Sequence, residues 1–112
     1  MWDLPEIVDI QIRRIPFKPN QPRNFKSALA GYKEAVEFMV RTSDLIPARA
    51  LGAALFVGDV QVTESQQVDN NLYRFLAFEI DRLKPGAPIR WGWINTPKEQ
   101  QQGTRFRYEE SR

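Results

Sequence analysis

Short runs of alternating apolar and polar residues recur along the chain, and this period-two pattern is the strongest restriction on its fold. Val8, Ile10 and Ile12 alternate with polar neighbours, as side chains do on a strand with one buried face. Arg14 interrupts the alternation, so we expect a bulge or the end of the strand there. The sequence therefore predicts a strand over residues 8–12.

The second half of the chain shows the same alternation. The expected strands cover residues 55–63, 72–83, 89–94 and 104–108. The run 72–83 also fits a helix, but we favour a strand because it is rich in aromatic residues and Lys84-Pro85-Gly86-Ala87 makes a good hairpin turn into the next strand. The polar segments 65–71 and 96–103 are expected to be a turn and a loop.

One segment instead shows helical spacing. Its apolar residues fall on one helical face: Phe25, Ala28, Leu29, Tyr32, Ala35, Val36, Met39 and Val40. Asn24 is a suitable N-cap, and Glu37 precedes Arg41 by four residues, the favourable order for an ion pair on a helix. The spacing predicts an amphipathic helix over residues 25–40.

The predicted order is one strand, one helix and then four strands. The simplest packing is an α+β fold, with an antiparallel sheet of four to five strands around the one amphipathic helix. This layout is similar to that of cystatins and of nuclear-transport-factor-like domains, and the resemblance is one of layout alone. With 112 residues and no internal repeat, the chain is expected to form a single domain over residues 1–112.

The composition removes several classes of chemistry. The chain has no cysteine and no histidine, which excludes thiolate nucleophiles, histidine general bases and zinc sites built from these residues. We expect no metal and no cofactor, and we favour a non-catalytic role. The N-terminal residues lack a signal-peptide pattern and the longest apolar run, residues 53–57, is too short to span a bilayer, so we expect a soluble, cytoplasmic protein.

Arginine residues on the last two expected strands are the main candidate binding site. If these strands pair, Arg90, Arg105 and Arg107 share one face and large aromatic residues share the other. Arginine binds carboxylate and phosphate groups well, and the net charge is +2, so an acidic protein surface or a nucleic acid is the expected partner. Exposed sheet edges also favour a protein partner or self-association. A solvated arginine face behind a buried aromatic core produces the same alternation.

A ligand pocket between the curved sheet and the helix is the alternative function. Tyr32, Met39, Trp91, Trp93 and Tyr108 would line such a pocket and bind a small molecule, with or without catalysis. The same large side chains would also serve plain core packing.

Three carboxylates are expected on the solvent face of the sheet: Asp59, Glu79 and Asp81. Paired carboxylates can divide acid and base roles when a pocket tunes them. Ion pairs with nearby arginines are the simpler interpretation of these residues.

Overall fold

The computed structural model describes residues 4–16, 34–47 and 52–109. Their strands are β1 (Ile7–Pro16), β2 (Glu34–Thr42), β3 (Ala53–Val57), β4 (Val60–Val62), β5 (Glu64–Asp69), β6 (Leu72–Ala77), β7 (Pro88–Trp93) and β8 (Gln102–Arg107). The helical elements of these ranges are two single 3₁₀ turns, η2 (Ile80–Arg82) and η3 (Lys98–Gln100).

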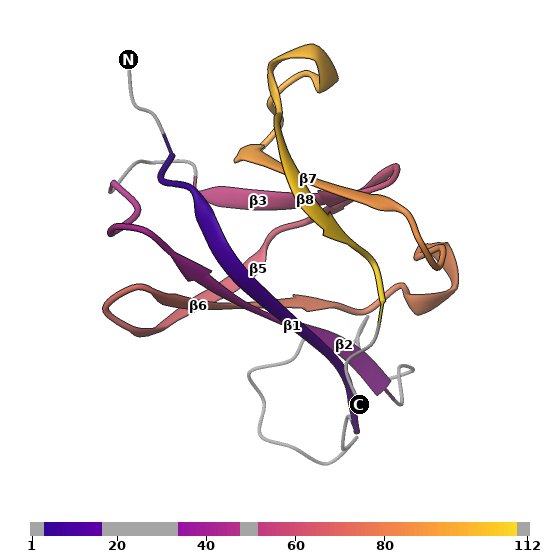
Figure 1. The fold of residues 1–112 in the computed structure, drawn as a ribbon. Coiled ribbons are helices and arrows are strands. Elements are labelled where there is room, and N and C mark those ends of the chain that lie inside the picture. The colour runs from indigo at the N-terminus through magenta and orange to yellow at the C-terminus, as the bar shows by residue number, and fades with distance from the viewer. Residues whose placement is uncertain (1–3, 17–33, 48–51, 110–112) are drawn as a thin grey trace.

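The strands form two antiparallel sheets of four strands each (Figure 1). Sheet A has the order β1-β2-β6-β5, and sheet B has the order β4-β3-β7-β8. The chain passes from β4 into β5 through Thr63 alone, so on one side the two sheets are joined by nearly continuous chain. On the other side β1 is the edge strand of sheet A and β8 is the edge strand of sheet B.

Both sheets contribute their inner faces to one hydrophobic core. Alternate residues of β2, Val36, Phe38 and Val40, are fully buried there, and Phe75 of β6 and Trp91 of β7 are 1% exposed. Burial of each such side chain contributes about 2–3 kcal/mol of transfer free energy. The core therefore holds the two sheets together and fixes which face of each strand is available for binding.

The prediction of an α+β fold with a sheet around one amphipathic helix is wrong. The described residues form a mostly antiparallel β structure with no helix longer than one 3₁₀ turn. Residues 34–40, the last part of the predicted helix, belong to β2. The rest of that helix, including the predicted cap Asn24, lies outside the described residues.

The error at β2 has a physical cause. Its apolar residues satisfy both the helical period and the strand period, so local pattern does not discriminate between them. β2 is hydrogen-bonded to β1 on one edge and to β6 on the other, and this pairing determines the strand conformation. Glu37 consequently forms ion pairs with neighbouring strands rather than the predicted helical pair with Arg41.

The strand predicted over residues 8–12 is confirmed as part of β1. The predicted irregularity at Arg14 is wrong, because Arg14 pairs in regular register with Val36. The register shift occurs instead between Ile7 and Asp9.

The strand predicted over residues 55–63 is a hairpin of β3 and β4 rather than one strand. Val57 pairs with Val60, and Gly58, with φ of 60°, begins the turn between them. Glycine adopts this left-handed conformation without steric cost, as two-residue hairpin turns require.

Residues 65–71 are mostly strand, not turn. β5 pairs with β6, and its described side chains are all solvent-exposed polar groups or the half-exposed Val68, which leaves no apolar period to recognise. The strand predicted over residues 72–83 is correct only as far as Ala77, because η2 follows.

The turn over residues 84–87 is confirmed. The N–H of Ala87 donates to the carbonyl oxygen of Lys84 at 3.0 Å, and Gly86 has a φ of 81°. The turn leads from sheet A to sheet B, however, rather than joining two adjacent strands of one hairpin.

Candidate functional site

The side of the molecule where the two edge strands approach each other carries the candidate site, which we call the β1–β8 seam. It is formed by β1 and β8, on the near side of the molecule in Figure 1. Arg105 of β8 crosses it, because its Nη2 donates to the carbonyl oxygen of Val8 on β1 at 3.0 Å. These residues are 97 positions apart in sequence.

Two grooves flank this arginine, each of about 350 Å³. The first is lined by residues that include Ile7, Trp91 and Thr104. The second is lined by Ile10, Ile12, Arg105, Phe106, Arg107 and Glu109. Arg105 lines both grooves, and each groove also includes one carboxylate, Glu6 in the first and Glu109 in the second. The seam is therefore a mixed apolar and charged surface that extends along β8.

The two arginines of the seam form no direct ion pair with a described carboxylate, although Glu6 and Glu109 line the same grooves. Arg105 and Arg107 are both exposed, and neither forms an ion pair within the described ranges. The Arg105 guanidinium carbon lies 4.6 Å from the centroid of the Phe106 ring, and Arg107 Nη1 donates to the carbonyl oxygen of Gly86 at 3.0 Å. Backbone and ring contacts therefore orient both groups without cancelling their charge.

Arg90, the third predicted arginine, lies apart from these two. Its half-buried guanidinium donates from Nε to Gln101 Oε1 at 3.0 Å, and Gln101 in turn donates to the carbonyl oxygen of Thr96. Thr96 packs on Gly92, where an added Cβ would lie 3.3 Å from the threonine side chain. Arg90 thus supports the β7–β8 loop and lines neither groove of the seam.

The predicted pairing of the two terminal strands is confirmed, although with a bulge between Pro88 and Arg90. Of the predicted pocket residues that the structure describes, Trp91 lines the first groove of the seam, and Met39, Trp93 and Tyr108 line none of the described grooves. Trp91 and Tyr108 are core residues, and Trp93 packs against the same core. Met39 alternates with the buried residues of β2 and so lies on the outer face of sheet A.

Tyr32 falls outside the described residues, so its predicted place in the pocket is untested. The rings of Phe38 and Tyr108 pack with their centroids 6.1 Å apart, which is ordinary core geometry.

The three predicted carboxylates lie in turns rather than on the face of a sheet. Asp59 is exposed in the β3–β4 turn, and Asp81 is exposed in η2. Glu79 precedes η2 and pairs with Arg82 at 2.9 Å, with both side chains more than half exposed. Such a pair is worth at most about 1 kcal/mol.

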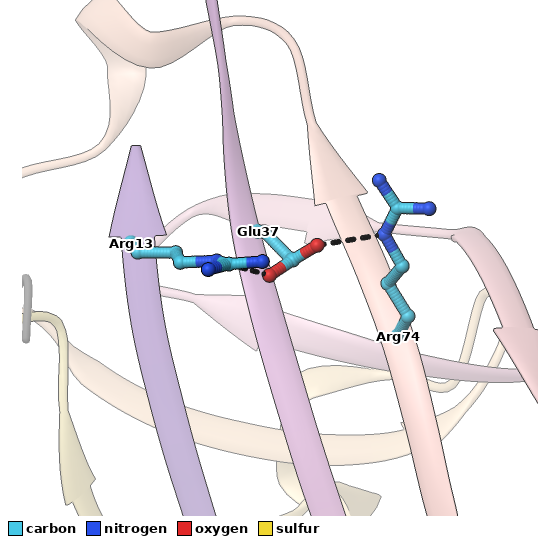
Figure 2. A network of polar contacts seen from close by, with 3 residues as sticks. All are labelled: Arg13, Glu37 and Arg74. Atoms are coloured by element: carbon cyan, nitrogen blue, oxygen red, sulfur yellow. Dashed lines mark hydrogen bonds and ion pairs between the residues drawn. The ribbon is translucent and has the colours of Figure 1, made fainter. Parts of the chain in front are cut away.

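Sequence reasoning missed a buried ionic cluster on the outer face of sheet A. Glu37 of β2 lies between Arg13 of β1 and Arg74 of β6 (Figure 2). Arg13 Nε donates to Oε1 at 2.6 Å and Arg74 Nε donates to Oε2 at 2.8 Å. A lone glutamate between Val36 and Phe38 would have indicated this cluster once residues 34–42 were recognised as a strand.

Comparison with protein-family models, curated proteins and solved structures finds no match to this chain. Within residues 4–16, 34–47 and 52–109, acidic side chains do not gather in a group that could hold a metal ion. No helix among these residues has the length and apolar character needed to cross a bilayer.

Proposed function

We propose that this protein is a non-catalytic binding domain that holds an extended acidic segment of a protein partner along the β1–β8 seam. The observation that carries the proposal is the position of Arg105, which is exposed, lacks a described acidic partner and lines both grooves. Arg107 adds a second such charge to the groove that Glu109 also lines, so the two arginines outnumber the carboxylate there.

Charge favours an acidic ligand. Arginine guanidinium groups bind carboxylates through short, charge-assisted hydrogen bonds, which are stronger than bonds between neutral groups. Arg105 now donates to a backbone carbonyl, and an incoming carboxylate would offer it a stronger acceptor. The chain's net charge of +2 adds a weak general attraction for an acidic partner.

The shape and apolar lining favour an extended peptide. The seam follows β8, a strand of six residues, and its second groove includes the apolar residues Ile10 and Phe106. A peptide in extended conformation alternates its side chains between two sides, so acidic residues can meet the arginines while apolar residues enter the grooves.

Nucleic acid is a weaker candidate because the aromatic residues are not free to stack on bases. Trp91 is 1% exposed, Tyr108 is 4% exposed, and the Phe106 ring is covered by the Arg105 guanidinium. Base stacking on exposed aromatic rings supplies much of the affinity for single strands.

Self-association through β8 is also disfavoured. Two copies that paired through this strand would bring the seam arginines of each copy close to those of the other. Like charges placed opposite each other on paired strands are destabilising.

A small-molecule pocket lined by Trp91, Trp93 and Tyr108 has less support. These side chains pack in or against the core, and of the three only Trp91 lines a groove of the described chain. The partner chemistry that remains best supported is an acidic polypeptide.

The test is fluorescence anisotropy with a labelled peptide in which glutamate alternates with valine, at about 50 and 200 mM salt. Two other kinds of ligand are titrated for comparison. A peptide with lysine in place of glutamate reverses the charge, and single- and double-stranded oligonucleotides carry negative charge on phosphates. We expect the acidic peptide to bind most tightly. Replacing both Arg105 and Arg107 with alanine should weaken it about tenfold or more, the loss expected for one or more charged hydrogen bonds.

Arg82→Ala is the matched control, because it removes an exposed arginine whose ion pair lies in the turn around η2. It lowers the net charge by one without touching the seam. The double variant removes two positive charges and Arg82→Ala removes one, so equal weakening per charge removed would show that binding depends on net charge alone. Tighter binding of an oligonucleotide, or unchanged affinity in the double variant, would refute the acidic-peptide assignment.

A further inference from the structure

The outer face of sheet A presents a buried carboxylate where a strand normally meets solvent. Glu37 alternates with Val36 and Phe38, which face the core, so its side chain lies on the opposite face. The residue is nevertheless only 3% exposed. Its two carboxylate oxygens accept one hydrogen bond each, from Arg13 and from Arg74.

Such a cluster is a poor source of stability. Burying a carboxylate carries a desolvation cost, and well-packed apolar residues often replace a buried ionic group at no loss. What the cluster does achieve is orientation of the arginines, because each guanidinium is bound through its Nε.

The orientation leaves one guanidinium ready to bind. Arg74 uses its Nε on Glu37, and its two Nη nitrogens point away from the carboxylate (Figure 2). These nitrogens donate no hydrogen bond within the described part of the chain, and the side chain is 33% exposed. Arg13 is 67% exposed and is therefore more solvated and less restrained.

A small hollow lies next to Arg74 at the β5 side of sheet A. Its volume is about 150 Å³, and it is lined by Ser65, Gln66, Arg74 and Leu76. Gln66 stands directly opposite Arg74 in the β5–β6 register, so the two side chains share one face. A water occupies about 30 Å³ of liquid, so the hollow has room for a group of a few heavy atoms.

We propose that Arg74, oriented by Glu37, binds an oxyanion in this hollow together with the Gln66 amide. The ligand is a carboxylate or phosphate group, since two parallel guanidinium N–H groups match two oxygens of either. Arg13, Glu37 and Arg74 together carry a net charge of +1, so the buried glutamate does not cancel the attraction. Glu37 is a positioning residue, and Arg74 and Gln66 are the binding residues.

This site is independent of the proposed function. It lies on β5 and β6 of sheet A, and none of its lining residues belongs to the β1–β8 seam. It could fail while the seam binds its peptide, and the reverse is equally true.

The test is NMR titration of the protein with sodium acetate and with inorganic phosphate at constant ionic strength, sodium chloride serving as the balancing salt. We expect saturable shifts of the Arg74 Nε–Hε and Gln66 side-chain signals, and the tighter of the two probes identifies the oxyanion. Arg74→Lys keeps the charge but loses the bidentate hydrogen-bonding geometry of the guanidinium, and Gln66→Ala removes the side-chain amide. Each should weaken binding about tenfold, the loss expected for a hydrogen bond to a charged group.

Gln100→Ala, an exposed glutamine of η3, is the control and should leave affinity unchanged. Glu37→Gln should weaken binding and speed solvent exchange of the Arg74 Nε–Hε proton while amide signals of the strands persist, a pattern that a purely structural role would not give. Unchanged affinity in Arg74→Lys or in Gln66→Ala, relative to the unsubstituted protein, would overturn the assignment. Shifts no larger than those from chloride alone, or shifts centred on Arg105, would overturn it as well.

Discussion

Replacing Glu37 with glutamine tests the energetics of the cluster on sheet A. The substitution keeps the size of the side chain and removes its charge. The amide retains one oxygen as an acceptor, but its NH₂ group faces an arginine N–H. Both of these groups are donors, so one hydrogen bond is lost and the two donors repel each other. Of the two bonds, the 2.8 Å contact to Arg74 is the better shielded.

The magnitude follows from the exposure of each partner. A hydrogen bond to a charged group contributes about 1.5–3 kcal/mol when shielded from water. Arg74 is 33% exposed, which favours the lower end of that range, whereas Arg13 is 67% exposed and its bond is worth at most about 1 kcal/mol. We therefore expect Glu37→Gln to lower the free energy of unfolding by about 2 kcal/mol.

Urea unfolding followed by tryptophan fluorescence measures this change, with an expected midpoint shift of about 1 M. Glu37→Met is the informative companion, because it removes the buried polar group altogether and lets both arginines return to water. It should cost less than Glu37→Gln. A loss below about 0.5 kcal/mol for glutamine, or a larger loss for methionine than for glutamine, would refute this reasoning.

Two further stability predictions use matched pairs and the same urea assay. Gly86→Ala forces an alanine to a φ of 81° and should cost about 1 kcal/mol, whereas Gly52→Ala, with open space and no positive φ, should change stability by less than about 0.5 kcal/mol; equal effects would contradict a backbone origin. Trp91→Ala should lower the free energy of unfolding by about 3–5 kcal/mol, because Trp91 is 1% exposed. Trp93→Ala should cost clearly less, because Trp93 is half-buried. A larger loss for Trp93→Ala would contradict the assignment of Trp91 to the core.

The parts of the fold that sequence predicts are those where a single period dominates. Residues 8–12 of β1 and the β7–β8 pair alternate apolar and polar residues along most of their length, and Gly86 follows Pro85 in a turn that glycine stabilises. β2 fits two periods at once and needs its neighbours β1 and β6 to decide between them. β5 is a polar edge strand, so it offers no burial signal at all.

The candidate site also has parts that the sequence predicts and parts that only the fold determines. Arg105 and Arg107 are recognisable from strand alternation, which predicts an arginine face, although the Arg105 guanidinium folds over the neighbouring Phe106 ring. The contact of Arg105 with β1 cannot be predicted in this way, because Arg105 and Val8 lie 97 positions apart and only the arrangement of the two sheets brings them together. Arg90 shows the converse, because the fold of the β7–β8 loop turns a predicted binding residue into a structural one.

The most direct test of the proposed function is to map backbone amide shifts while the acidic glutamate–valine peptide is added to the protein. The account predicts the largest shifts along β1 and β8, centred on Val8, Arg105 and Arg107, with little change near Arg90 and smaller shifts at Gln66 and Arg74 from the separate oxyanion hollow. Shifts centred on β5 and β6, or confined to the loop that Arg90 supports, would contradict the assignment of the β1–β8 seam as the binding surface.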